Sequence, residues 1–132
     1  MKKVLFLSVF AMFFSFAYAQ EAVIEFKEKE FDFGTIKEED GKATTTFEFT
    51  NTGDAPLVIN GVSASCGCTT PDWSREPIAP GATGFVKASY DTAGRPGPFR
   101  KSITVKSNAS EQSVLLFIVG DVIPKPKVED NN

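Results

Sequence analysis

The sequence contains no histidine, and both of its methionines, Met1 and Met12, lie at the N-terminal end. Histidine is the usual general base near neutral pH and a common metal ligand, and the methionine thioether is a usual soft ligand for Cu(I). Cysteine is equally scarce, because the chain has only Cys66 and Cys68. These absences remove most arrangements for acid–base catalysis and leave the cysteine pair as the most distinctive chemistry of the chain.

Long hydrophobic runs are also rare, since Val4 to Ala17 is the one extended apolar stretch. A short basic segment, Met1 to Lys3, precedes it, and the small-x-small pattern of Ala17 to Ala19 follows it. This combination predicts a signal peptide over residues 1–19, with a retained N-terminal anchor as the alternative. A membrane span needs about 20 apolar residues, so we expect no membrane span after cleavage. The mature chain is then exported, to the periplasm or out of the cell.

The charge balance argues against two classes of partner. The chain has 14 Lys and Arg against 17 Asp and Glu, a net charge of −3, and removal of Lys2 and Lys3 with the leader gives 12 − 17 = −5. Nucleic acids and anionic membranes require clustered positive charge. The basic residues of the mature chain are scattered, as at Arg75, Lys87 and Arg95. We therefore expect no nucleic-acid partner.

Apolar and polar residues alternate along most of the mature chain, which is the pattern of half-buried β-strands. In the clearest case, Ala43 to Thr50, Phe47 and Phe49 point one way while Glu48 and Thr50 point the other. The first predicted strand is either continuous or broken by a kink near Lys27 to Glu30. The predicted strands lie within residues 23–36, 43–50, 57–62, 84–90, 99–107 and 113–122.

Several connections and one strand have distinctive compositions. Lys37 to Gly41 is predicted to be a charged, solvated turn. The loop that holds the cysteines is expected to run on through Ile78. Asp91 to Pro98 is predicted to lie outside the strands, because proline lacks the N–H that a sheet ladder needs. Val114 to Val119 is apolar at successive positions, which predicts a central strand covered on both faces.

No segment has helical spacing over three turns. Roughly seven short strands with turn signals between them predict an all-β, immunoglobulin-like antiparallel β-sandwich, with an up-and-down barrel as the alternative. The expected boundaries are a signal peptide at 1–19, the sandwich domain at 20–123 and a disordered tail at 124–132. Cysteines two positions apart cannot bridge facing sheets, so the core must depend on burial of Phe, Val, Ile and Leu.

A series of short motifs gives the sequence a family resemblance. The motifs are Phe31–Ile36, Phe47–Leu57, Ser65–Pro71, Ile78–Gly81, Gly97–Phe99 and Ile118–Gly120. In them the chain resembles a bacterial exported family called domain of unknown function 1573, over nearly the whole mature length. The resemblance implies an immunoglobulin-like sandwich related to the abnormal-spindle and Hydin-like domains, and it implies secretion. It implies no reaction, since the family has none assigned.

The cysteine pair has four interpretations. A local disulfide or a buried thiol pair shapes the loop; a strained bridge exchanges with other thiols; two thiolates bind a soft metal such as copper; or one cysteine bonds to another chain or acts as a nucleophile. The ring closed by Cys66 and Cys68 is small, so it adds little entropic stabilisation to the fold. We predict a disulfide or thiol pair without a catalytic role.

The neighbours Gly67, Thr69, Asp72 and Trp73 are predicted to form a recognition loop with the pair, although a lone tryptophan is more often a core residue than a ligand platform. We expect a non-enzymatic exported module that binds a protein or cell-envelope partner, with no catalytic residue, metal or cofactor. Thiol redox or copper handling through Cys66 and Cys68 is the alternative function. The oligomeric state stays open.

Overall fold

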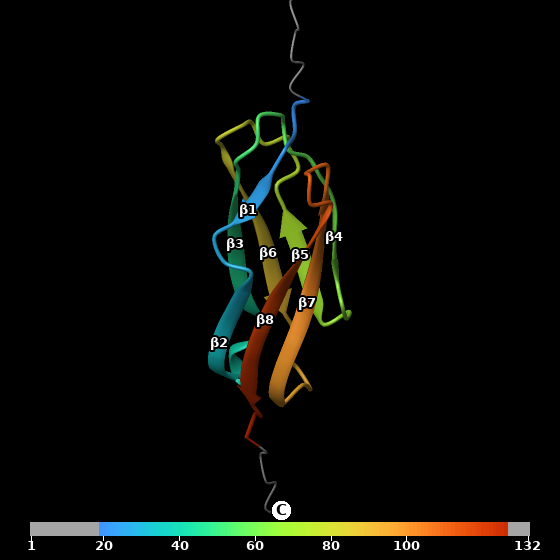
Figure 1. The fold of residues 1–132 in the computed structure, drawn as a ribbon. Coiled ribbons are helices and arrows are strands. Elements are labelled where there is room, and N and C mark those ends of the chain that lie inside the picture. The colour runs from blue at the N-terminus through green and yellow to red at the C-terminus, as the bar shows by residue number, and fades with distance from the viewer. Residues whose placement is uncertain (1–18, 127–132) are drawn as a thin grey trace, which may run out of the picture.

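The alternating segments form eight β-strands and a short 3-10 helix within residues 19–126, which are the residues that the computed structural model describes. The elements are β1 (Ile24–Phe26), β2 (Glu30–Lys37), η1 (Glu38–Asp40), β3 (Ala43–Asn51), β4 (Ile59–Ala64), β5 (Thr69–Trp73), β6 (Thr83–Tyr90), β7 (Gly97–Ser107) and β8 (Ser113–Ile123). The strands form two four-stranded sheets, and Figure 1 shows that the chain enters at one end of the sandwich and leaves at the other.

The strand order identifies the type of sandwich. One sheet has the order β1-β3-β6-β5, and the other has the order β2-β8-β7-β4. In a constant-type immunoglobulin domain the two sheets hold strands ABED and CFG. Here β1, β3, β6 and β5 take the places of A, B, E and D, while β4, β7 and β8 take those of C, F and G. The predicted β-sandwich is confirmed, and the barrel alternative is wrong.

Strand β2 is the departure from a purely antiparallel sandwich. β1 pairs antiparallel with β3, and β2 pairs parallel with β8 in the opposite sheet. The predicted kink near Lys27 to Glu30 is therefore confirmed, because the chain changes sheets there without reversing direction. A β-bulge follows between Asp32 and Thr35, where Gly34 has φ of +66°, a conformation that glycine adopts without strain.

The cysteine loop is shorter than predicted. Thr69–Trp73 forms β5, which pairs antiparallel with β6, so the loop ends at Cys68 instead of continuing through Ile78. Ile78 itself forms an isolated antiparallel bridge with Leu57. The segment can be a strand despite Pro71 because β5 lies at the edge of its sheet, where a proline is tolerated.

The prediction that Pro98 lies outside the strands is also wrong, because β7 begins at Gly97. The Ser107 N–H donates to the Gln112 carbonyl in the turn between β7 and β8. The backbone N–H and C=O groups of the odd-numbered residues of β7 therefore point toward β8. The nitrogen of Pro98 therefore faces the β4 side of the sheet. Strand β4 pairs with β7 no nearer to Pro98 than Ile103, so the missing N–H costs no ladder bond.

Strand β8 has the predicted central position, between β2 and β7. The prediction that both of its faces are covered is wrong, because Leu115 is 50% exposed while Leu116 and Ile118 are fully buried. A two-layer sandwich covers only the inner face of each sheet, so the outer face of β8 meets solvent.

The core lies between the two inner faces. Its largest fully buried apolar side chains are Phe49, Leu57, Val86, Ile103, Val105, Leu116, Ile118 and Val122. Within residues 19–126 no helix is long and apolar enough to cross a membrane. Apart from Ala19 the predicted signal peptide lies outside the described residues, as does the predicted tail beyond Pro126.

Asn51 is the one amide among the buried polar residues of the described sandwich, and its side chain is fully buried at the end of β3. Its Nδ2 donates to the carbonyls of Ala55 and Ile78, at 2.7 and 2.9 Å. Its Oδ1 accepts from the N–H groups of Val23 and Gly53, at 3.3 and 3.0 Å. One amide thereby joins the entry to β1, the turn after β3 and the loop before β6. A buried amide is stabilising only when it is satisfied in this way.

We therefore expect Asn51→Asp to lower the free energy of unfolding by about 2–4 kcal/mol, because a carboxylate cannot donate to the two carbonyls: the Ala55 carbonyl loses its bond to Asn51, and the Ile78 carbonyl keeps only the bond from the Leu57 N–H. The measurement is urea denaturation, read as a lower midpoint at an unchanged m-value. Asn60→Asp is the matched control on an exposed position, with an expected change within about 0.5 kcal/mol. Equal effects of the two substitutions would show that the Asn51 amide is not a structural centre.

Candidate functional site

The two cysteines lie in the turn between β4 and β5, toward the end of the sandwich at which the chain leaves β8 (Figure 1). Their sulfur atoms are in contact, and their Cα atoms are 5.3 Å apart, inside the range of about 4.4–6.8 Å that a disulfide requires. The Cys68 side chain is buried, with 5% exposure, while Cys66 is only half-buried. Gly67 between them is exposed, and nothing in the structure requires a glycine there, because an added Cβ would meet no atom within 4 Å.

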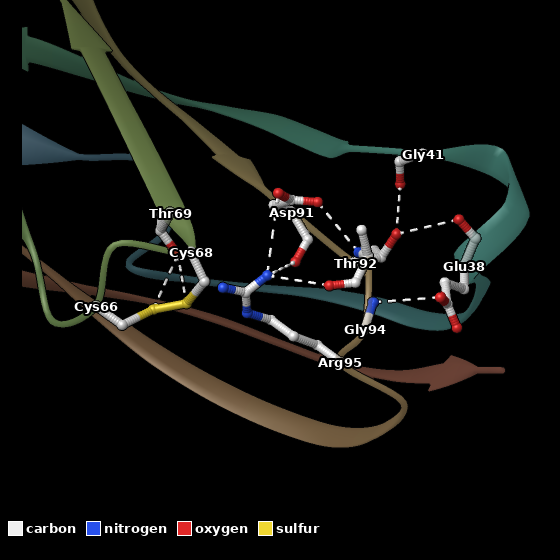
Figure 2. Close-up of polar contacts among 10 residues, drawn as sticks. Glu38, Gly41, Cys66, Cys68, Thr69, Asp91, Thr92, Gly94 and Arg95 are labelled. Atoms are coloured by element: carbon white, nitrogen blue, oxygen red, sulfur yellow. Dashed lines mark hydrogen bonds and ion pairs between the residues drawn. A yellow bond between two sulfur atoms is a disulfide. The ribbon is translucent and has the colours of Figure 1, made fainter.

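Thr69 is a buried residue at the start of β5, and not part of an exposed loop as predicted. Its hydroxyl oxygen lies 4.0 Å from the sulfur of Cys66 and 3.9 Å from that of Cys68 (Figure 2). Its N–H donates to the Cys66 carbonyl over a long 3.4 Å. Thr69 therefore supports the turn from inside the sandwich.

Tyr90 pairs with Thr69 across β5 and β6. Its ring is buried and stacks on Phe99 of the opposite sheet, with centroids 4.0 Å apart and planes 16° apart. Burial raises the pKa of the Tyr90 hydroxyl above its ordinary value. This aromatic pair joins the two sheets beneath the cysteine turn.

Asp72 and Trp73 lie at the far end of β5 from the cysteines. Trp73 follows Cys68 by five positions, which along a strand amounts to about 16 Å. The Trp73 ring packs partly against the core, as the structural interpretation of a lone tryptophan predicts, and the Arg75 guanidinium lies 3.5 Å from its centroid. Asp72 accepts from the Trp73 N–H at 2.9 Å. The predicted recognition loop thus divides into a cysteine turn and a separate Trp73 edge.

The loop between β6 and β7 is bonded to the cysteine turn. The Cys68 carbonyl accepts from the Asp91 N–H at 2.8 Å. Asp91 Oδ1 in turn accepts from the Ala93 N–H at 3.1 Å, and its other carboxylate oxygen lies 3.9 Å from the Arg95 guanidinium. Arg95 also donates to the Ala93 carbonyl at 3.2 Å. Figure 2 shows the Arg95 side chain extending from this loop toward Asp91 and the start of β5.

Glu38, in η1, joins the same loop to the end of β8. Its carboxylate accepts from the N–H of Gly94 at 3.2 Å and from the N–H of Lys125 at 3.1 Å. The Lys125 bond first, and then the Gly94 bond, hold the pKa of the Glu38 carboxyl below its usual value. The hydroxyl of fully buried Thr92 donates to the Gly41 carbonyl at 2.8 Å, which fixes η1 against the loop.

We call this set of segments the cysteine end; it consists of residues 38–41, Cys66–Thr69, residues 91–96 and Lys125. Sequence reasoning identified the cysteines but missed Glu38, Asp91 and Arg95. The sequence predicts only a charged, solvated turn for Lys37 to Gly41 and a non-strand segment for Asp91 to Pro98. No local pattern distinguishes these residues, because the partners of Glu38 lie 56 and 87 positions along the chain.

The chemistry available at the cysteine end is that of two sulfur atoms with a neighbouring hydroxyl. Within the described part of the chain, no three or more Cys, Asp or Glu side chains are grouped so as to hold a metal ion. The two sulfurs alone are the soft ligands that the arrangement offers to copper.

The described residues form a β-sandwich with the strand order of an immunoglobulin domain and an adjacent cysteine pair. The family model described as "Protein of unknown function (DUF1573)" matches residues 24–122, so the chain belongs to that family. The family resemblance seen in the sequence motifs is thereby confirmed. No curated protein matches the chain.

Three solved structures are similar in fold. A protein of unknown function from Porphyromonas gingivalis W83 is 19% identical, with a TM-score of 0.68 over 78% of this chain and 48% of that one. The secreted serine protease VesC from Vibrio cholerae is 16% identical, with a TM-score of 0.58 over 80% and 24%. The Vibrio cholerae VesB protease is 15% identical, with a TM-score of 0.59 over 76% and 32%. This chain spans about half or less of each, and the likeness is one of fold alone.

The Glu38 contacts predict a pH dependence of the cysteine end. Because the pKa of Glu38 is lowered in the folded state, its contribution to stability is present above the unfolded value of about 4.3 and is lost as pH falls through the folded value. In an NMR titration the Gly94 and Lys125 amide shifts should move together, with a midpoint below about 4.3. Glu38→Gln should abolish that movement and Glu39→Gln should preserve it. A midpoint at or above the ordinary glutamate value would contradict the assignment.

Proposed function

We propose that this chain is an exported, non-enzymatic module that binds a protein or cell-envelope partner through the cysteine end. The observation that carries the proposal is the cross-linking of that end. Four segments far apart in the sequence meet there: the Asp91 N–H donates to the Cys68 carbonyl, the Thr92 hydroxyl donates to the Gly41 carbonyl, and the Glu38 carboxylate accepts from the N–H groups of Gly94 and Lys125. Loops held at one end of a rigid sandwich are a common place for recognition.

Export is part of the proposal and rests on the sequence of residues 1–19. A short basic start, an apolar run and a small-x-small site are the marks of a secretory leader. An oxidising destination also suits the cysteine pair, since thiols that lie close together join there. We therefore propose that Cys66 and Cys68 form a disulfide in the exported protein and that the bridge fixes the shape of the turn.

Thiol exchange or copper handling is the second candidate function. The specific observation in favour of thiol exchange is that Cys66 is half-buried while Cys68 is buried, which makes Cys66 the more accessible residue of the pair. Copper handling has a narrower basis, namely the two adjacent sulfurs. Titration of the reduced protein with Cu(I) tests the copper alternative, because a copper site would require both cysteines. Thiol exchange requires only one accessible sulfur.

The disulfide is tested by the intact mass of protein isolated from the exported fraction. We expect a mass lower than that of the reduced chain by the two hydrogens that oxidation removes, and we expect the difference to disappear after reduction. Alkylation before reduction should label neither cysteine. Two alkylated thiols in the native sample would contradict the proposal that the pair is bridged.

Partner binding is tested by a matched pair of arginine reversals. Arg95 lies at the cysteine end and Arg75 at the far end of β5, with side chains 43% and 64% exposed. Arg95→Glu should reduce recovery of a partner cross-linked in the native envelope by about fivefold, which corresponds to about 1 kcal/mol. Arg75→Glu should leave recovery unchanged. Loss with Arg75→Glu instead would move the recognition surface to the Trp73 edge.

A further inference from the structure

The two cysteines are held in different ways by their surroundings. Cys68 directly precedes β5, its carbonyl accepts from the Asp91 N–H at 2.8 Å, and its side chain is 5% exposed. Cys66 lies on the turn itself, and its carbonyl has only the long 3.4 Å contact with the Thr69 N–H. Its side chain is half-buried. The pair is therefore asymmetric, with one fixed inner sulfur and one outer sulfur on the turn.

This asymmetry determines which sulfur an incoming thiol can reach. A thiolate attacks a disulfide sulfur in line with the sulfur–sulfur bond and opposite the sulfur that leaves. Cys66 is half-buried and Cys68 is buried, so an incoming thiol reaches Cys66 more readily, and attack on Cys66 makes Cys68 the leaving sulfur. Attack on Cys68 would require access to a side chain that is only 5% exposed.

We propose that the exported protein undergoes thiol–disulfide exchange with an external thiol, that Cys66 is the sulfur attacked, and that Cys68 is the internal resolving thiol. This inference rests on the proposed disulfide. The thiolate of the partner forms a bond to the Cys66 sulfur, and the Cys66–Cys68 bond breaks. Its electron pair leaves with Cys68, which takes up a proton equivalent to the one lost by the partner. The partner is a cysteine thiol, either free or in a peptide.

The reverse step is also built into the turn. After exchange Cys68 stays next to the mixed disulfide, because the Cα atoms of the two cysteines are 5.3 Å apart and the flanking backbone is bonded on both sides. Attack by Cys68 on Cys66 is then intramolecular and has a high effective concentration. It expels the partner thiol and restores the bridge. The Thr69 hydroxyl contacts both sulfur atoms that take part in the exchange.

The backbone makes this opening local. Ser65 N–H donates to the Ser102 carbonyl on one side of the turn, and Asp91 N–H donates to the Cys68 carbonyl on the other, both within 2.9 Å. Strands β4 and β5 are thus held by β7 and β6 independently of the bridge. Reduction changes the turn without separating the strands.

The test compares the single variants Cys68→Ser and Cys66→Ser as purified full chains. With a disulfide reagent such as 5,5′-dithiobis(2-nitrobenzoate), the Cys66 thiol of Cys68→Ser should react at least about tenfold faster than the Cys68 thiol of Cys66→Ser, because a buried thiol is inaccessible to the reagent. Equal rates, or a faster Cys66→Ser variant, would overturn the proposal. Circular dichroism of both variants checks that each is folded.

The oxidised wild type gives an independent measurement that needs no variant. It is treated with free cysteine in one arm and a single-cysteine peptide in the other, quenched with acid, and mapped by mass spectrometry. A mixed disulfide on Cys66 in either arm supports the proposal, and the more reactive arm identifies the source of the thiol. A mixed disulfide on Cys68, or neither a mixed disulfide nor reduced cysteines in either arm, rejects it. The isolated protein is used, so failure here leaves the binding proposal standing, and loss of partner binding leaves this result unaffected.

Discussion

The buried amide of Asn51 is the interaction on which the end of the sandwich opposite the cysteines depends. It donates twice and accepts twice, and its four partners belong to the entry to β1, the turn after β3 and the loop before β6. Without the amide the Val23 and Gly53 N–H groups and the Ala55 carbonyl would each lose the bond it gives them, and the Ile78 carbonyl would keep only the bond from the Leu57 N–H. Gly53 belongs to the same arrangement, because an added Cβ would lie 2.2 Å from the Glu21 carbonyl oxygen. This end of the molecule is thus fixed by hydrogen bonds, without help from the cysteines at the other end.

The cysteine turn has a structural role as well as a chemical one, because it helps to protect the edge strand β5. Two hydrogen bonds show which backbone groups of β5 face β6: the Ser74 N–H donates to the Phe85 carbonyl, and the Asp91 N–H donates to the Cys68 carbonyl. The backbone N–H and C=O groups of the even-numbered residues of β5 therefore point toward β6. The outward N–H groups are then those of the odd-numbered positions. Thr69 uses its N–H on the Cys66 carbonyl, Pro71 has none, and Trp73 donates to Asp72. No outward donor of β5 is left for an added strand, which is how natural sheets avoid aggregation at their edges.

Period-two alternation was enough to predict most of the fold. It located β3, β6, β7 and β8, and together with the turn signals it led to the sandwich. It did not give the parallel pairing of β2 with β8, which depends on the chain changing sheets at Lys27–Lys29. It also missed β5, because that strand is short and has Pro71 at its centre, and neither feature is typical of a strand. At the cysteine end, Cys66 and Cys68 could be recognised from composition alone, because they are the only cysteines of the sequence. Glu38 could not be recognised, because its role comes from two N–H groups that only the folded chain brings to it.

The Asn51 amide, at one end of the sandwich, therefore contributes to the stability of the fold, while the reactive cysteine pair lies at the other end. A ring closed by cysteines two positions apart constrains very little of the unfolded chain, so the bridge contributes little to the free energy of folding. The core and the Asn51 amide hold the sheets together, and backbone bonds on both sides of the turn hold β4 and β5. A bridge that the fold does not need is one that can open without unfolding it. That independence is the physical condition for a cysteine pair to exchange with an external thiol while the proposed recognition surface around Glu38 and Arg95 keeps its shape.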